Sequence, residues 1–383
     1  MMNWLTGSKD AEARKFVNQL KDGSKRDRAR AELLRMGVEA VPALIEALQT
    51  ADPNLLPFCQ AVLARMGTAA TPALTYSLLN DHPLIRARVA EVLAQTKDAN
   101  AIPALLSALR GEFYTVRGRA ARALGAIADP DTIGPLLEAL KDPELEVRIE
   151  AVKAIGKFKD VETFDNMADL LLEDPQIEAR QSAAIALGET LHPRAIPYLM
   201  LALQDPFWWY EREQAADALL KAIAGMGTLA VEALLEALTD SEGTVRRYAA
   251  RLLGQIRDPR SIQPLGLALY DTHFEVGRVA AESLAGFGPT GLKVLAETLR
   301  HPETWLRQHA IAGLTLSGDK RIVPIILDML KDPDREVQKQ AIQSLGILKD
   351  ARAVPTLQAI AIDRRDREMS ALAREAIKTV TST

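Results

Sequence analysis

The sequence has few of the residues that disulfides, metal sites and base stacking require. Its 383 residues include one cysteine, Cys59, which excludes an intramolecular disulfide and a cysteine-rich zinc site. Only 5% of the residues are aromatic. The 47 lysines and arginines are outnumbered by 51 aspartates and glutamates, for a formal net charge of −4. The chain therefore lacks the overall positive charge typical of nucleic-acid-binding proteins.

Long hydrophobic runs are missing as well. No stretch reaches 18 uninterrupted apolar residues, so we expect no single helix to span a membrane. The apolar stretch at the N-terminus, Met1 to Leu5, is too short for the core of a secretory signal and is followed by no cleavage pattern. We therefore expect a soluble, cytoplasmic protein.

Sequence motifs for catalysis are not present. The chain has no phosphate-binding loop of the Gly-x-x-x-x-Gly-Lys-Ser/Thr type, no His-Glu-x-x-His and no Gly-x-Ser-x-Gly. Cys59 is surrounded by Phe58, Val62 and Leu63 and has no neighbouring base, which predicts a buried apolar side chain rather than a nucleophile. We therefore predict no catalytic residue, no metal ligand and no cofactor.

A repeat dominates the rest of the sequence. The nine residues 101–109 recur in closely similar form at 132–140, 195–203 and 322–330. Pro72, Pro103 and Pro135 stand 31 and 32 residues apart, and Pro324 and Pro355 stand 31 apart. A fixed period in this range indicates stacked supersecondary units rather than one closed core.

Residues 101–130 represent one unit. Ile102, Leu105, Leu106 and Leu109 follow the i, i+3, i+4, i+7 spacing of a helix, and Pro103 suits its first turn. After Gly111, a second apolar stripe predicts a second helix: Val116, Ala120, Ala121, Leu124 and Ile127. Two short helices cannot bury their apolar faces alone, so we expect stability to come from stacking on the neighbouring units.

Four columns of residues recur in register. Aspartates in the turn inside each unit are predicted to cap the second helix: Asp81, Asp142, Asp174, Asp205, Asp240, Asp271 and Asp332. Arginines follow five or six residues later: Arg86, Arg117, Arg148, Arg180, Arg246 and Arg307. Glycines inside the second helix suggest that another helix passes too close for a Cβ atom: Gly125, Gly156, Gly188, Gly254 and Gly346. A second set of aspartates marks the turn into the next unit: Asp98, Asp129, Asp160, Asp258, Asp319 and Asp350.

This pattern of helix proline, turn aspartate, Val-Arg, Ala-Ala and Leu-Gly resembles the HEAT repeat. The period of about 31 residues is shorter than the usual length of about 40 and resembles the compact HEAT-like units named after phycobilisome bilin lyases. The resemblance implies an all-α fold, a right-handed α-α superhelix of about 11–12 two-helix repeats. We expect residues 1–38 to form N-terminal capping helices or a degenerate repeat, residues 39–352 the repeat array, and residues 353–383 a C-terminal capping repeat of one continuous solenoid.

The resemblance also implies that the second helices line a concave face. Aromatic residues gather in the turns at the edge of that face: Phe113, Tyr114, Phe207, Trp208, Trp209, Tyr210, Phe274 and Trp305. Two interpretations are open. These side chains fill gaps where successive units twist, or they form a partner site centred on Trp208 and Trp209. The acidic unit at residues 163–191 is the other departure from the regular pattern.

The charged residues also allow two interpretations. The aspartate and arginine columns, with Asp142, Asp174 and Asp240 among their members, form a structural ladder or line a groove that binds carboxylates or phosphates. Basic clusters, one of which contains Arg246, Arg247, Arg251, Arg257 and Arg260, are a solvated face or a patch for an acidic partner or a nucleic acid.

Taken together, these features favour a non-catalytic scaffold or adaptor that binds a protein or peptide partner on its concave face. One alternative, implied by the resemblance alone, is a bilin-lyase-like protein that handles a tetrapyrrole. Nucleic-acid binding is a further alternative, which the net negative charge disfavours. HEAT-like arrays also include a di-iron hydroxylase whose metal is held by His-Glu pairs, and no His-Glu pair occurs in this sequence.

Overall fold

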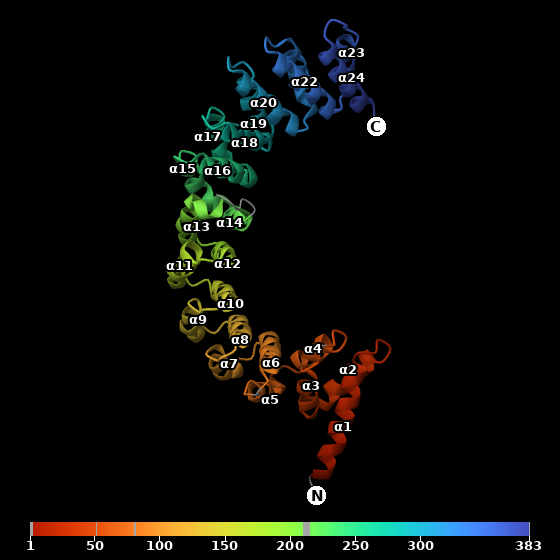
Figure 1. Cartoon of the computed structure of the whole chain (residues 1–383), viewed down its shortest axis with the longest axis vertical. Helices are drawn as coiled ribbons and strands as arrows, with labels where there is room; N and C mark the ends of the chain where they lie inside the picture. Colours follow the sequence, from red (N-terminus) through yellow and green to blue (C-terminus); the bar gives the residue numbers. More distant parts are fainter. Residues whose placement is uncertain (1–2, 51, 80–81, 210–214, 383) are drawn as a thin grey trace. The chain divides into compact units, whose positions relative to one another are not determined.

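Helices account for all regular structure in the described part of the chain. The computed structural model describes residues 3–50, 52–79, 82–209 and 215–382, and no strand occurs among them. Asp81 and Tyr210 lie outside the described residues. A first and a second helix alternate along the chain (Figure 1). The predicted all-α solenoid of paired helices is confirmed, and the pairs α1–α2 to α23–α24 number twelve within the described ranges. The right-handed sense of the superhelix stays a prediction.

The two helices of a pair differ in length. The first helices are α1 (Asn3–Gln19), α3 (Val41–Ala47), α5 (Thr71–Ser77), α7 (Ile102–Leu109), α9 (Ile133–Ala139), α11 (Phe164–Glu173), α13 (Ile196–Gln204), α15 (Val231–Ala237), α17 (Ile262–Ala268), α19 (Gly288–Thr298), α21 (Val323–Asp328) and α23 (Val354–Ala361). The second helices are α2 (Arg26–Met36), α4 (Leu56–Met66), α6 (Pro83–Thr96), α8 (Tyr114–Ile127), α10 (Leu145–Gly156), α12 (Ile177–Glu189), α14 (Ala216–Gly225), α16 (Gly243–Ile256), α18 (Phe274–Ala285), α20 (Thr304–Leu316), α22 (Arg335–Leu348) and α24 (Arg367–Thr381).

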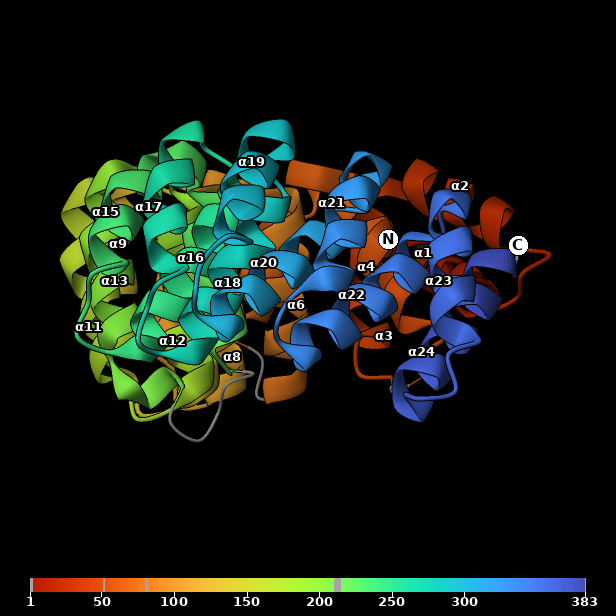
Figure 2. The ribbon, with the colours of Figure 1, turned by 90° about the horizontal axis from the view of Figure 1, so that it is seen from above.

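The chain divides into two compact units. Unit 1 comprises Met1–Ala202 and Glu211–Ala222, and unit 2 comprises Leu203–Tyr210 and Ile223–Thr383. Consecutive second helices pack on one another in each unit, from α6 to α12 in unit 1 and from α16 to α24 in unit 2. Figure 2 shows α18, α20 and α22 side by side. The predicted capping roles of residues 1–38 and 353–383 stay predictions.

The pair α7–α8 shows how one repeat folds. Pro103 stands in the first turn of α7, where a missing N–H costs no hydrogen bond. The side chains of Leu105 and Leu109 on α7 and of Val116 and Leu124 on α8 are buried, as the apolar stripes predict. Their burial between the two helices and the neighbouring repeats supplies the hydrophobic stabilisation that a single pair lacks.

Aspartates organise the turns on both sides of the second helix. Inside the repeat, the Asp142 carboxylate accepts the backbone N–H of Glu144, the residue that precedes α10. The aspartate thus orders the turn before the helix rather than occupying the capping position itself. Between repeats, Asp98 and Asp129 cap short 3₁₀ turns by accepting the N–H two residues later.

The recurring glycines lie where one second helix crosses the next. A Cβ atom added at Gly125 would stand 2.4 Å from the Cβ of Ala154 on α10, and one at Gly156 would stand 2.9 Å from the Cβ of Ala186 on α12. At Gly254 the nearest atom is the Ser283 hydroxyl oxygen on α18, at 2.3 Å. Real Cβ atoms do not approach this closely, so the prediction that a neighbouring helix excludes a side chain is confirmed.

Arginines and aspartates connect consecutive repeats. The arginine of one second helix reaches the turn aspartate of the next repeat with N–O distances of 2.6–2.7 Å in four pairs: Arg117–Asp142, Arg148–Asp174, Arg246–Asp271 and Arg307–Asp332. Each of these arginines also donates to two carbonyl oxygens of its own turn, as Arg307 does to His301 and Pro302. The guanidinium group therefore joins two successive turns, which is the structural ladder expected from the sequence.

Two predicted members of the ladder, Arg86 and Asp240, are bonded differently. The Arg86 guanidinium lies 5.0 Å from the centre of the Phe113 ring, because the turn at 111–113 carries no aspartate. Arg180 keeps the bond to its own turn and donates to the Asp174 carbonyl oxygen at 2.6 Å. Asp240 accepts from the Gln204 side chain at 2.9 Å, and the preceding second helix follows a stretch outside the described residues.

The ladder favours ionised aspartates. Burial alone would raise the pKa of Asp142, but the hydrogen bonds from Arg117 and from the Glu144 N–H outweigh it and hold the pKa below its usual value. Asp271 has a lowered pKa for the same reasons, with Arg246 and the His273 N–H as its donors. Both carboxylates therefore contribute more to stability when they are charged.

The hydrophobic helices are short. Among the described residues no single helix has both the length and the apolar composition needed to cross a membrane, as the sequence predicts. One pair, Ala216–Gly225 and Gly227–Ala237, meets these criteria only when its two helices are joined across a bend of 106°.

We expect Gly125→Val to lower the free energy of unfolding by about 1–3 kcal/mol, because the new side chain forces α8 away from α10. Urea unfolding followed by circular dichroism measures the change. The control is Gly225→Ala, where an added Cβ meets no atom within 4 Å and stability should not fall. Equal effects of the two substitutions would contradict a role for the close crossing.

We expect Arg307→Ala to lower the free energy of unfolding by about 3 kcal/mol, because it leaves the Asp332 carboxylate buried without its partner. The two side chains are only 8% and 4% exposed. The matched control is Arg321→Ala. Arg321 pairs with Asp319 but is 75% exposed, so its loss should cost less than about 1 kcal/mol.

The lowered aspartate pKa values predict sensitivity to acid. A carboxyl group with a folded-state pKa below the unfolded value of about 3.9 stabilises the fold above that pH and loses the contribution as the pH falls through its folded-state pKa. The unfolding midpoint should therefore be nearly constant from about pH 7 to 5 and fall below about pH 4. Asp142→Asn should weaken this dependence. An unchanged acid transition would exclude Asp142 from it.

Candidate interaction site

Aromatic side chains stand exposed where second helices begin. Phe113 directly precedes α8 and Tyr114 is its first residue, with 38% and 44% of their surfaces exposed. Phe274, the first residue of α18, is 55% exposed. The structure therefore places these three predicted residues where a partner could contact them.

The described aromatic residues of this turn, 207–209, are mainly a packing feature. The Trp208 side chain is completely buried and meets Phe207 edge to face, with the ring centres 6.5 Å apart. The half-buried Trp209 donates its indole N–H to the Leu203 carbonyl oxygen at 3.3 Å. Trp208 therefore cannot be part of the predicted partner site, because its side chain has no exposed surface. Tyr210 is outside the described residues.

Phe274 and Trp305 meet around a buried histidine. The His309 ring centre lies 4.5 Å from the Phe274 ring and 5.5 Å from the half-buried Trp305 ring. Burial lowers the pKa of His309, and the nearby Arg278 charge lowers it further. The ring packs beside Gly277, the position at which the ladder arginine is replaced by glycine in this repeat. The sequence did not predict this cluster, although Gly277 was the available signal.

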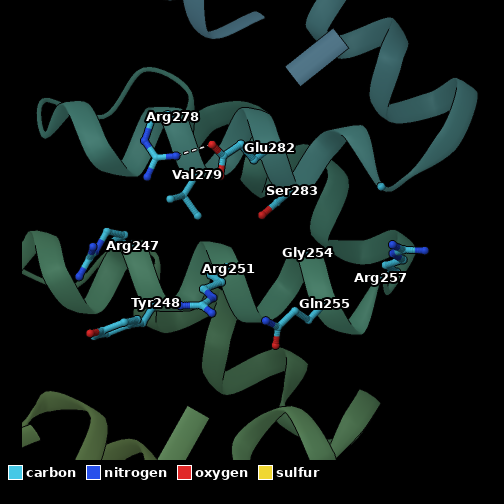
Figure 3. A pocket seen from close by; sticks show the side chains of 11 residues that line it. Arg247, Tyr248, Arg251, Gly254, Gln255, Arg257, Arg278, Val279, Glu282 and Ser283 are labelled. Carbon is cyan, nitrogen blue, oxygen red and sulfur yellow. Dashed lines mark hydrogen bonds and ion pairs between the residues drawn. The ribbon is translucent and has the colours of Figure 1, made fainter. Parts of the chain in front are cut away.

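A basic pocket of about 340 Å³ lies between α16 and α18 (Figure 3). Four arginines line it: Arg247, Arg251, Arg257 and Arg278. Gly254, Ser283 and Gly286 also line the pocket, and Gln255 adds a polar edge. The predicted basic cluster is thereby divided, because Arg246 belongs to the ladder and Arg260 pairs with Glu232 and Asp258.

The charges in this basic pocket are only partly paired. Arg278 bonds to Glu275 and Glu282 of its own helix, as Figure 3 shows for Glu282. The Arg247 guanidinium lies 4.9 Å from the centre of the buried Tyr248 ring. Arg251 and Arg257 are exposed and make no ion pair or hydrogen bond with any of the described residues. Sequence reasoning missed Arg278, which occupies the position of Arg247 one repeat later.

Other candidate chemistry is structural. Cys59 is buried, and burial raises its thiol pKa to about 12, so the thiolate is not available near neutral pH. In the acidic repeat, Asp174 belongs to the ladder and Asp165 accepts from the Tyr198 hydroxyl. No group of three or more metal-ligating side chains occurs within the ranges that the structure describes.

Solved structures of similar fold include karyopherin chains. Kap121p bound to Nup53p matches with a TM-score of 0.60 and 14% identity over 97% of this chain and 49% of that chain. Kap121p bound to the extreme C-terminus of the protein phosphatase Cdc14p matches with a TM-score of 0.58 and 12% identity, over 97% and 50%. This chain thus spans about half the length of these relatives. At such identities the likeness shows the fold alone.

A third match, human deoxyhypusine hydroxylase in complex with glycerol, has 23% identity over 74% of this chain and 98% of that one. Its TM-score of 0.30 is too low to support an argument. No curated protein sequence matches the chain.

Comparison with protein families identifies the type of repeat. The HEAT-repeat model matches residues 71–144, 102–187, 133–220, 231–292 and 292–378, which together cover well over half of the sequence. The matched segments contain the helix prolines, the ladder and the close-crossing glycines described above. The chain therefore belongs to the HEAT-repeat family.

Proposed function

We propose that this chain is a non-catalytic scaffold that binds a protein or peptide partner on the face formed by its second helices. The observation that carries the proposal is the exposure of Phe113, Tyr114 and Phe274 at the start of second helices in separate repeats. Aromatic side chains are enriched at the energetic centres of protein interfaces. Tyr114 and Phe274 are the first residues of second helices, one in each compact unit, so each unit presents an aromatic anchor on its own second helices.

Proteins of similar fold support this proposal. The Kap121p chains in the matching structures are bound to Nup53p and to the C-terminus of Cdc14p. A partner lying along the second helices, on the concave face of the predicted array, would use the surface in the same general way. The non-catalytic part of the proposal rests on the sequence, which lacks nucleophile and phosphate-loop motifs. A cytoplasmic site of action belongs to the same proposal.

The test compares aromatic side chains on the two kinds of helix. The chain is immobilised and exposed to soluble extract of the organism that produces it, and the retained proteins are quantified by mass spectrometry. We expect the triple variant Phe113→Ala/Tyr114→Ala/Phe274→Ala to reduce recovery of the specific partner about tenfold, because anchor residues dominate binding energy.

The matched control is Tyr76→Ala on the first helix α5. Tyr76 is 78% exposed, so the control also removes an exposed aromatic ring. Recovery should stay close to that of the wild type. Loss of the partner with Tyr76→Ala alone would place binding on the first helices and contradict the proposed face. If the wild type retains no protein specifically, the scaffold function itself is wrong.

A further inference from the structure

Paired charges cover the surface between second helices in unit 1. On α8, Arg119 bonds to Glu146 of α10 at 3.0 Å, and Arg122 bonds to Glu150 of α10 at 3.1 Å. Arg119 also reaches Glu91 of α6 at 2.7 Å. Each arginine of α8 on this surface thus has a carboxylate from the adjacent helix, which leaves little unmatched charge to attract a ligand.

The basic pocket of unit 2 departs from this scheme at one position. Counted from the ladder arginines Arg117 and Arg246, Arg251 of α16 occupies the place of Arg122. The place of Glu150 on the following helix is taken by Val279, which is only 7% exposed. A valine cannot accept a hydrogen bond, so the carboxylate that would neutralise Arg251 is missing.

Among the described residues, the remaining carboxylates do not balance the basic pocket. Glu275 and Glu282 are both bonded to Arg278. Arg251 and Arg257, which also line the pocket, have no carboxylate partner among the described residues, so positive charge is in excess there. A hollow lined by one sign of charge concentrates its field and attracts ligands of the opposite sign. The excess is local, because the whole chain is negative.

We propose that the basic pocket binds an extended acidic segment of a protein partner through Arg251 and Arg257. Arginine favours carboxylates because its planar group forms two parallel hydrogen bonds with them. The proposal rests on the proposed function and specifies the chemistry of the partner.

The pocket suits a peptide better than a nucleic acid or a folded domain. Its volume of about 340 Å³ fits a short segment. Proteins that bind single-stranded nucleic acids present exposed aromatic rings for base stacking. The aromatic ring that lines this pocket, that of Tyr248, is 2% exposed and lies beside the Arg247 guanidinium. The net negative charge of the chain also opposes a long polyanion.

The binding test uses the full chain and a fluorescent peptide in which glutamate and serine alternate. Fluorescence anisotropy at physiological salt gives the dissociation constant. A control peptide has glutamine in place of every glutamate. We expect the glutamate peptide to bind at least about tenfold more tightly. Equal affinities, or no binding of either peptide, would overturn the proposal.

Two variants locate the site. Arg251→Gln/Arg257→Gln should weaken the glutamate peptide about tenfold. Arg364→Gln/Arg367→Gln removes the same charge from exposed positions outside the pocket and should change affinity less than about twofold. Equal losses would mean that binding follows net charge alone and would overturn the proposal.

A third variant, Val279→Glu, supplies the missing carboxylate. It should pair with Arg251 as Glu150 pairs with Arg122 and reduce peptide binding as strongly as the double substitution does. Circular dichroism checks that each variant is folded, and the arginine variants keep the test decisive if Val279→Glu is not.

An oligonucleotide of equal charge serves as competitor. If it displaces the peptide more effectively than unlabelled peptide does, and its own binding requires Arg251, the site is for nucleic acid and the proposal is wrong. Failure of peptide binding while the immobilised chain still retains a partner through its exposed aromatic residues would refute this inference alone.

Discussion

The structure depends on the close contact between consecutive second helices. At Gly125 in unit 1 and Gly254 in unit 2 the neighbouring helix approaches so closely that no side chain fits, and the buried leucines and alanines around each point form the core of its unit. The arginine of each ladder pair must reach its own turn and the turn of the next repeat at the same time. The close helix contact fixes the distance between these two turns. Packing therefore sets the spacing at which the charged groups can act.

Most of this fold could be predicted from the sequence because the same structural residues recur along the repeats. The helix prolines, the close-crossing glycines and the turn aspartates each have one local cause, and the HEAT resemblance followed from their order. The ladder was predicted without its direction, since spacing alone does not say which neighbouring turn an arginine reaches. Membership of the compact, lyase-named class of repeats stays a prediction, as does the concave face.

The site was harder to predict because burial and pairing depend on neighbours in space. Tryptophan is a residue type that is enriched at protein interfaces. Trp208 is nevertheless completely buried in the fold. Arg251 resembles Arg122 in the sequence, and the difference between them lies on the following helix, where Val279 replaces a glutamate. A repeat array encodes function in such differences between equivalent positions, which become visible once the repeats are aligned through their structural residues.

The ladder has a consequence for how such a chain can change its length. Each bridge runs from the arginine of one repeat to the aspartate of the next, as in Arg117–Asp142 followed by Arg148–Asp174. A repeat that contains both groups, such as the one with Asp142 and Arg148, therefore brings one acceptor and one donor in a fixed order along the chain. A duplicated gene segment of one full period inserts both, and the bridges on either side close again without compensating mutations. Because each ion pair runs in the same direction along the chain, the array can be lengthened by whole repeats.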